Sequence, residues 1–188
     1  MKYLYSITIY LVFYLITFQV ELNSQDFTIA VIPDPQYYTD NAYCKSEDLY
    51  NRTTQWIVDN KNLYNIKFVA NMGDLTNDNE TAQWVVAKDA HLILRNNNIP
   101  FSVVPGNHDY GSENPATRNT VNFQNYFGST YFNPPWYTGT HTGGIANTYN
   151  TFEVGNLKFL ILNLEYAART DIICWANNVY KVFLIEES

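Results

Sequence analysis

Residues that can bind metal ions occur in three short blocks of the 188-residue sequence. The blocks are Asp34-Pro35-Gln36, Gly73-Asp74 and Gly106-Asn107-His108-Asp109. Asp, Asn and Gln side chains supply oxygen ligands, which suit hard or borderline divalent cations. Either of the first two blocks alone is also typical of an ordinary turn at a strand end. The three together predict a metal site.

Each block follows a short apolar run that is typical of a buried β-strand. The runs comprise residues 27–32, 66–72 and 101–104. Between them, residues 46–60 and 79–97 repeat apolar side chains at helical intervals. Strand, helix, strand, helix, strand with short connections predicts a parallel sheet built from right-handed βαβ units. The three blocks are then expected at the carboxyl ends of neighbouring strands, where open α/β sheets bind their ligands.

Each predicted helix is expected to bury one face. In and just after the first, the repeating positions are Leu49, Thr53, Trp56, Ile57, Asn60 and Tyr64. In the second, the stripe consists of Trp84, Ala87 and Leu94. His91 lies beside this stripe, so it is interpreted as a partly buried helix residue and not as a ligand.

Residues 111–144 combine Gly, Pro, Asn, Ser and Thr with many aromatic residues, and they are expected to form a long ordered loop. Two interpretations stay open. The aromatic side chains either pack over the open edge of the sheet, or they wall a pocket for a sugar or nucleoside leaving group. His141 is interpreted as an ordinary loop histidine.

The last part of the chain contains one more pair of apolar runs and one helical pattern. Residues 149–154 and 157–164 flank Gly155-Asn156, which predicts a β-hairpin with a two-residue turn. Residues 171–182 predict a further helix.

The three blocks resemble the motifs of the calcineurin-like metallophosphoesterases: Asp-x-His, Gly-Asp-x-x-Asp and Gly-Asn-His-Asp/Glu, each after a strand. The third motif is complete at residues 106–109, and the resemblance extends over residues 27–182. It implies an α/β fold in which helices flank a β-sandwich core, in the order αββα. It also implies two divalent metal ions, of Mn, Fe, Zn or Mg, and hydrolysis of phosphate mono- or diesters of small molecules.

The resemblance also implies a role for each polar residue. The implied metal ligands are Asp34, Gln36, Asp74 and Asn107. Among them, Asp74 bridges the two ions. His108 hydrogen-bonds the substrate phosphate or protonates the leaving oxygen, and Asp109 is a partner that orients it. The two cations neutralise the phosphoryl oxygens and activate water for in-line attack on phosphorus.

Two positions depart from the family pattern, as does the end of the sequence. Gln36 stands where the family usually has His, as in a branch with Asp-Pro-Gln, and Asn77 replaces the second Asp of Gly-Asp-x-x-Asp. The family takes further ligands from a later Gly-His-x-His block, whereas only His141 follows His108 here. Residues 25–188 are therefore expected to be the N-terminal part of the domain, incomplete at the C-terminus, with impaired turnover. The alternative is a secreted, non-catalytic binding module that retains the fold.

Residues 1–24 are predicted to be a secretory signal peptide. Lys2 precedes an apolar stretch over residues 4–20, and a polar segment follows it. A membrane anchor is the competing interpretation, because the stretch is near the minimum that spans a bilayer. Its position and its single basic residue favour the signal. The protein is therefore expected to be secreted or extracytoplasmic, with no stable membrane anchor once the leader is cleaved.

Composition limits the classes of partner. The formal net charge is −7 and charged residues make up only 15% of the chain. Strong binding to nucleic acid is therefore not expected. Cys44 and Cys174 lie far apart and in no metal-binding spacing, which argues against C-x-x-C chemistry. Whether they form a disulfide stays open.

Overall fold

The computed structural model describes residues 26–40, 47–111, 115–128, 137–141 and 144–186. They form two three-stranded sheets. The first sheet is parallel and contains β1 (Thr28–Ile32), β2 (Ile66–Asn71) and β3 (Phe101–Ser102). The second is antiparallel and contains β4 (Tyr137–Thr140), β5 (Thr148–Val154) and β6 (Leu157–Asn163).

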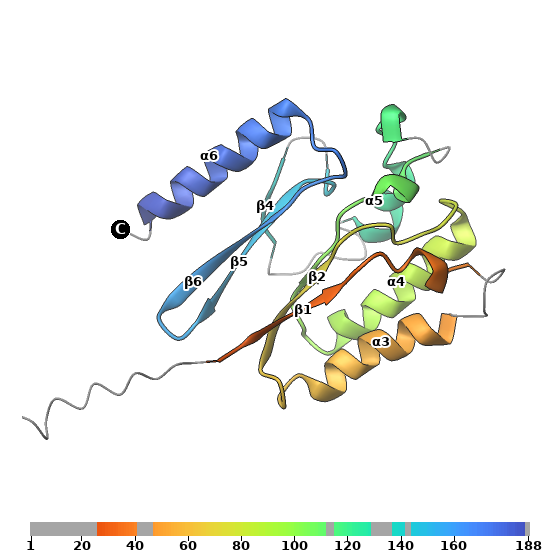
Figure 1. Ribbon diagram of the computed structural model, residues 1–188, viewed down its shortest axis with the longest axis horizontal. Coiled ribbons are helices and arrows are strands. Elements are labelled where there is room, and N and C mark those ends of the chain that lie inside the picture. Colours follow the sequence, from red (N-terminus) through yellow and green to blue (C-terminus); the bar gives the residue numbers. More distant parts are fainter. Residues whose placement is uncertain (1–25, 41–46, 112–114, 129–136, 142–143, 187–188) are drawn as a thin grey trace, which may run out of the picture.

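Helices cover the outer faces of the two sheets (Figure 1). The helices α3 (Glu47–Asn60) and α4 (Thr81–Asn96) lie outside the parallel sheet. The helix α6 (Thr170–Glu186) lies outside the antiparallel sheet. This αββα arrangement confirms the predicted fold class. The hairpin β5–β6 is also confirmed, and α6 is longer than predicted.

The strand register brings the predicted metal-binding blocks to one edge of the molecule. Ile32, the last residue of β1, pairs with Asn71, the last residue of β2. Ala70 of β2 pairs with Ser102 at the end of β3. Because the strands are parallel, the segments that follow them start side by side. The ladder of β3 is shorter than predicted, since Val103 and Val104 follow it outside the strand.

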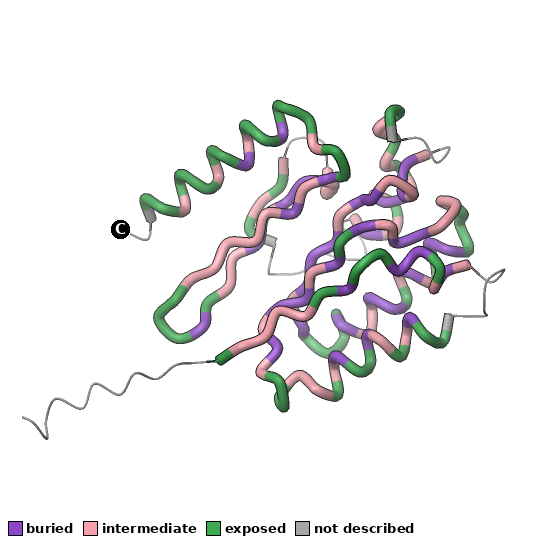
Figure 2. Tube along the Cα trace, in the orientation of Figure 1, coloured by how far each residue is buried: buried purple, intermediate pink, exposed green. Residues whose placement is uncertain are grey.

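The core lies between the parallel sheet and its helices, as the distribution of buried residues in Figure 2 shows. The stripe Trp84, Ala87 and Leu94 of α4 is fully buried, as predicted. His91 is fully buried as well, which corrects the expectation of partial burial.

The segment 111–144 is more regular than the predicted loop. Its described part contains η4 (Pro115–Thr117), α5 (Val121–Phe127) and strand β4. The α5 side chains of Phe123 and Phe127 are fully buried against Trp84, and Tyr126 stacks on the same indole with ring centroids 6.0 Å apart. These aromatic residues therefore pack into the core. Trp136 and the other aromatic residues at 129–136 lie outside the described residues.

The buried face of α3 differs from the predicted one. Tyr50, Thr54 and Ile57 are buried, whereas Leu49 and Trp56 are 45% and 53% exposed. The predicted stripe was therefore correct only at Ile57. The physical reason is that β1 is the edge of its sheet in the described part of the chain, where no further strand covers the outer flank of the helix.

Aromatic contacts join the two sheets. The ring of Phe68 in β2 stacks on Phe152 in β5 with centroids 5.6 Å apart. Phe27, just before β1, lies 4.8 Å from Phe159 of β6, again between ring centroids. These contacts form the sandwich core that positions the ends of both sheets relative to each other.

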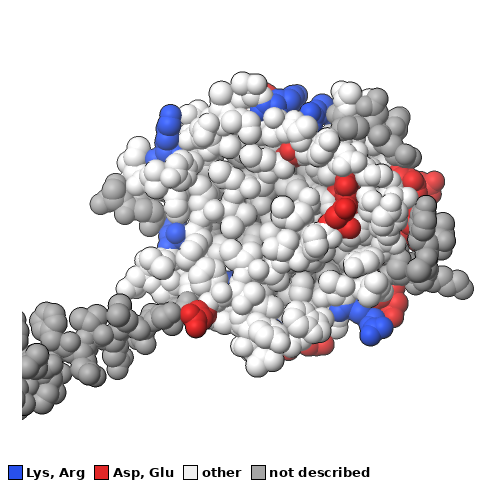
Figure 3. Space-filling model, viewed as in Figure 1, with Lys and Arg blue, Asp and Glu red and all other residues white. Residues whose placement is uncertain are grey.

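The predicted leader at residues 1–24 and Cys44 lie outside the described residues. Within the part of the chain that the structure describes, no helix combines the length and apolar character needed to cross a membrane. Cys174 is exposed on α6. Figure 3 shows one face of the molecule, on which charged side chains are few and scattered.

Candidate functional site

Two of the predicted ligands sit on unusual backbone. Asp34 has a φ of 45° and Asp74 a φ of 47°, which is the left-handed region of conformational space. Asp occupies this region more readily than most residues, but at a cost in conformational energy. Strained backbone of this kind is concentrated at functional sites. The loops after β1 and β2 therefore each contain a residue with strained backbone, a feature that is common at functional sites.

Two glycines allow the second and third loops to touch. Gly73 has a φ of 95°, and a Cβ built there would lie 2.7 Å from the backbone nitrogen of Gly106. A Cβ on Gly106 would in turn collide with the backbone nitrogen and Oδ1 of Asp74. Only residues without a side chain permit this approach. The glycines in the two motifs thus serve loop contact, which places Asp74 directly against the 106–109 turn.

Asp74 lies at the centre of the cluster. Its Oδ1 accepts a hydrogen bond of 2.8 Å from the backbone nitrogen of His108. Burial raises the pKa of Asp74 above its ordinary value, and the neighbouring Asp34 carboxyl, which is within hydrogen-bonding reach, raises it further. The hydrogen bond from His108 acts in the opposite direction. The structure therefore brings Asp34, Asp74 and His108 together.

The ring of His108 is held by a backbone group. Its Nδ1 lies 2.6 Å from the carbonyl oxygen of Asn77. A carbonyl only accepts hydrogen bonds, so Nδ1 carries the hydrogen and Nε2 is left as the nitrogen that gains or loses a proton. The side chain of Asn77 points to other partners, donating to Asp40 at 2.9 Å and to Asp78. Asn77, which departs from the family motif, thus contributes to the site through its backbone carbonyl, which holds the His108 ring.

Asp109 has a different role from the one expected. Its carboxylate is fully buried and accepts four hydrogen bonds, at 2.9–3.0 Å, from the backbone of Leu75, Thr76 and Gly106 and from the Thr76 hydroxyl. Burial raises its pKa to about 7, and these hydrogen bonds oppose the shift. The hydrogen bond of the His108 ring goes to Asn77, so the predicted orienting partnership with Asp109 is wrong. Asp109 instead joins the second and third loops.

The other two predicted ligands lie beside this cluster in sequence. Gln36 begins the short helical turn η1 (Gln36–Tyr38), two residues after Asp34, and is buried. Its Oε1 is a buried acceptor that finds no hydrogen-bond donor among the described residues. Asn107 begins the turn η2 (Asn107–Asp109), between Gly106 and His108, which both contact Asp74.

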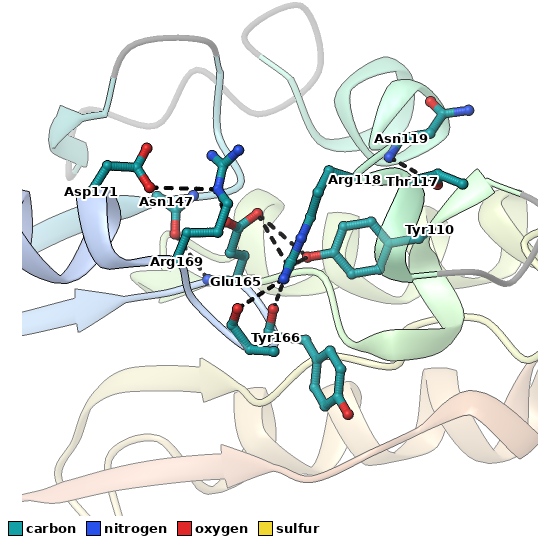
Figure 4. Close-up of polar contacts among 10 residues, drawn as sticks. Tyr110, Thr117, Arg118, Asn119, Asn147, Glu165, Tyr166, Arg169 and Asp171 are labelled. Carbon is teal, nitrogen blue, oxygen red and sulfur yellow. Dashed lines mark hydrogen bonds and ion pairs between the residues drawn. The ribbon is translucent and has the colours of Figure 1, made fainter.

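A second polar cluster, which the sequence did not reveal, surrounds Glu165 (Figure 4). Glu165 follows β6, and its side chain is 5% exposed. Its Oε2 lies 3.9 Å from Nη1 of Arg118 and accepts a hydrogen bond of 3.4 Å from the hydroxyl of Tyr110. Its Oε1 lies 3.5 Å from Nε of Arg169. The available signal in the sequence is a polar residue directly after the apolar run of residues 157–164.

Arg118 connects this cluster to the loop that carries His108. Its guanidinium donates to the carbonyl oxygens of Tyr166 and Ala167, at 2.6 and 2.9 Å, and to the hydroxyl of Tyr110 at 3.2 Å. The backbone nitrogen of Tyr166 donates to the carbonyl of Pro105 at 3.0 Å. The end of the antiparallel sheet is therefore tied to the third motif.

A large apolar cavity lies away from all of these residues. It has a volume of about 710 Å³ between β1 and α3, and it is lined mainly by apolar side chains, including Val31, Leu49 and Trp56. None of the predicted site residues lines it. The apolar cavity and the residues able to bind metal therefore lie in different places. We assign the candidate site to the residues, because their side chains can support catalysis.

Two comparisons with known proteins found matches to this chain. A family model described as calcineurin-like phosphoesterase matches residues 27–183. The uncharacterized protein YvnB of Bacillus subtilis (strain 168) is 28% identical over 156 residues, which are 82% of this chain and 12% of that protein. The chain therefore spans only a small part of the length of this relative.

Proposed function

The chain belongs to the calcineurin-like phosphoesterase family, and from this premise we propose that the Asp34–Asp74–His108 cluster hydrolyses phosphate esters with the help of divalent metal ions. The observation that carries the proposal is the contact between two carboxyl groups from neighbouring parallel strands. Two adjacent carboxylates repel each other unless a proton or a cation lies between them. A divalent cation is the natural partner for such a pair.

The donor set fits a divalent cation that prefers oxygen. Divalent metals are typical of the family. Asp34 and Asp74 supply carboxylates, and the buried Oε1 of Gln36, which lacks a donor among the described residues, adds a neutral oxygen. Asn107 follows Gly106 at the same turn and offers an amide. When bound, a cation supplies positive charge to the phosphoryl oxygens and activates water.

His108 is the group proposed to act on the substrate. The carbonyl of Asn77 fixes its ring, so Nε2 is the atom that exchanges protons. Nε2 either donates a hydrogen bond to a phosphoryl oxygen or gives its proton to the leaving oxygen. Asp109 acts as a positioning residue, because it holds the backbone of the two loops that carry Asp74 and His108.

The test is metal-dependent hydrolysis of p-nitrophenyl phosphate and its bis ester by the 188-residue chain with Mn²⁺ or Zn²⁺. Asp74→Asn keeps the size of the side chain and removes the charge, and it is expected to lower activity by about 100-fold. Asp89→Asn is the matched control, because Asp89 lies on α4 with a 54% exposed side chain. Hydrolysis that is independent of metal, or equal in the two variants, would contradict the proposal.

The second candidate is a non-catalytic binding module that retains the fold. One observation favours it: the described residues contain no group of three or more His, Cys, Asp or Glu side chains arranged to hold a metal ion. Isothermal titration with Mn²⁺ separates the candidates. Absence of saturable metal binding, together with no turnover of either ester, supports the module, whereas metal binding with turnover supports the enzyme.

A further inference from the structure

We propose that a small polar cavity beside the candidate site binds a neutral group that carries several hydroxyls. The cavity has a volume of about 190 Å³. The residues that matter for the argument are Arg118, Gln124, His141, Asn147, Glu165 and Arg169, all of which line it. Identifying the bound group with the leaving group of a phosphate ester rests on the proposed function.

Four segments converge on this cavity. They are the residues before α5, α5 itself, His141 with residues 144–147 between β4 and β5, and the connection between β6 and α6. The last of these is tied to the third motif by the hydrogen bond from Tyr166 to Pro105. Loops from separate elements that enclose a polar space next to a reactive site are the usual construction of a ligand pocket.

Glu165 provides an acceptor that has no donor. Its side chain is 5% exposed, yet its Oε1 finds no hydrogen-bond donor among the described residues. The Nε of Arg169 lies 3.5 Å from this oxygen as an ion-pair partner. Leaving a buried carboxylate oxygen without a hydrogen bond is costly, and native proteins rarely do so without a functional reason. A hydroxyl on a ligand would supply the missing donor.

Arg169 provides the complementary donors. Figure 4 shows its terminal nitrogens turned away from Glu165 and Asp171, both of which pair with its Nε, so these nitrogens point toward other groups. A hydroxyl can donate to a carboxylate and accept from a guanidinium at the same time. A carboxylate and a guanidinium facing one small space therefore match a group with neighbouring hydroxyls.

The balance of charge and the size of the cavity define the ligand further. The cationic Arg118 and Arg169 are compensated by Glu165, which lines the cavity, and by Asp171, whose Oδ1 lies 3.6 Å from Nε of Arg169. With two charges of each sign, the site offers no net attraction to an anion or a cation, which favours a neutral ligand. Its volume is below the range of about 300–1,000 Å³ that holds drug-sized ligands, so the group is small.

Several residues around the cavity have positive φ values, as two residues of the candidate metal site do. Arg118 and Ala167 have φ values of 52° and 47°, and Gly144 has a φ of 131°. A Cβ on Gly144 would collide with the amide of Gln124, whose Oε1 accepts a hydrogen bond of 3.2 Å from Ile145. This contact fixes the amide so that Nε2 is available as a further donor. Strained residues of this kind gather at ligand-binding positions.

The test is a titration of the metal-free 188-residue chain with myo-inositol, followed by the side-chain amide NMR signals of Gln124 and Asn147. Saturable shifts of both signals are expected, and cyclohexanol, which keeps the ring but has one hydroxyl, should produce none. Arg169→Gln should weaken binding by about tenfold, as loss of a charged hydrogen bond predicts. Arg95→Gln, at the exposed end of α4, is the control and should leave binding unchanged.

Glu165→Gln provides a second variant that removes the charge of the acceptor, with an expected loss of similar size. Absence of saturable shifts with myo-inositol, or an equal response to cyclohexanol, would overturn the inference. The metal-free titration does not depend on catalysis. A comparison of glycerol 3-phosphate with propyl phosphate then separates the two proposals. No hydrolysis of either contradicts the proposed function, whereas equal kcat/KM for both contradicts the leaving-group assignment.

Discussion

Asp109 and Glu165 are two buried carboxylates on the same edge of the molecule, and they are satisfied in opposite ways. Asp109 receives all of its hydrogen bonds from residues of its own and the neighbouring loop, three of them from backbone nitrogens. Glu165 is surrounded by the side chains of Arg118, Arg169 and Tyr110. The first arrangement uses every lone-pair direction of the carboxylate, and the second leaves one oxygen without a donor.

This difference suits the two carboxylates to different tasks in the site. Backbone donors cannot move without moving the loops, so Asp109 fixes the distance between the loops that carry Asp74 and His108. Long side chains adapt at low cost, so Glu165 and its cationic partners can rearrange around a ligand. The comparison predicts that one carboxylate controls stability and the geometry of the site, whereas the other controls recognition.

The largest expected effect is that of Asp109→Asn. The amide nitrogen would face two of the four donors, leaving them without an acceptor in the interior, and the free energy of unfolding should fall by about 4 kcal/mol. Glu165→Gln should cost only about 2 kcal/mol, because Arg118 keeps its two carbonyl acceptors. Urea denaturation followed by circular dichroism measures both. Equal losses in the two variants would remove the distinction between the two carboxylates.

A second prediction concerns His91, a buried titratable group with no charged partner among the contacts described. Its ring packs against Tyr50, Phe101 and Phe127, and its Nδ1 bonds the carbonyl of Ala87. Burial lowers its pKa from 6.5 to about 4. Because the folded state holds the ring neutral, the unfolded state binds more protons below pH 6.5. The contribution of His91 to the free energy of unfolding should therefore fall by about 3 kcal/mol as the pH drops from 6.5 to 4.

The variant His91→Leu isolates this contribution. It removes the titrating group from both the folded and the unfolded state, and Asp109 titrates in the variant as in the wild type. The difference in unfolding free energy between the two proteins should change by about 3 kcal/mol between pH 7 and pH 4. A difference that is constant with pH would show that burial does not lower the pKa of His91 in the folded state.

Much of the candidate site followed from the sequence, because strand ends are easy to recognise. Apolar runs closed by Pro or Gly located the three loops, and the parallel order placed them at one edge. The contact of Asp34 with Asp74 and the bond from His108 to Asp74 agree with this order. Spacing along the chain was sufficient here, since each residue lies within a few positions of its strand.

Other features depend on which segments meet in space, and the sequence pattern did not contain that information. The outer stripe of α3 is exposed because β1 is an edge strand, which periodicity alone does not show. Asp109 seemed a partner for its neighbour His108, but its donors lie 33 and 34 residues away and at Gly106. The cluster around Glu165 joins residues 47–55 positions apart.

The smallest predicted effect tests how much a single donor to Asp109 contributes. Thr76→Val keeps the shape of the side chain and the backbone nitrogen, but it removes the hydroxyl that lies 3.0 Å from Oδ1 of Asp109. Thr54→Val is the matched control, since its buried hydroxyl donates to the neutral carbonyl of Asn51 at 3.0 Å. Hydrogen bonds to charged acceptors are stronger, so above pH 7, where Asp109 is mostly ionised, we expect losses of about 2 and 1 kcal/mol. If urea denaturation gives the same loss for both, Asp109 is not ionised in the folded protein, and its loops are held by a neutral carboxyl group.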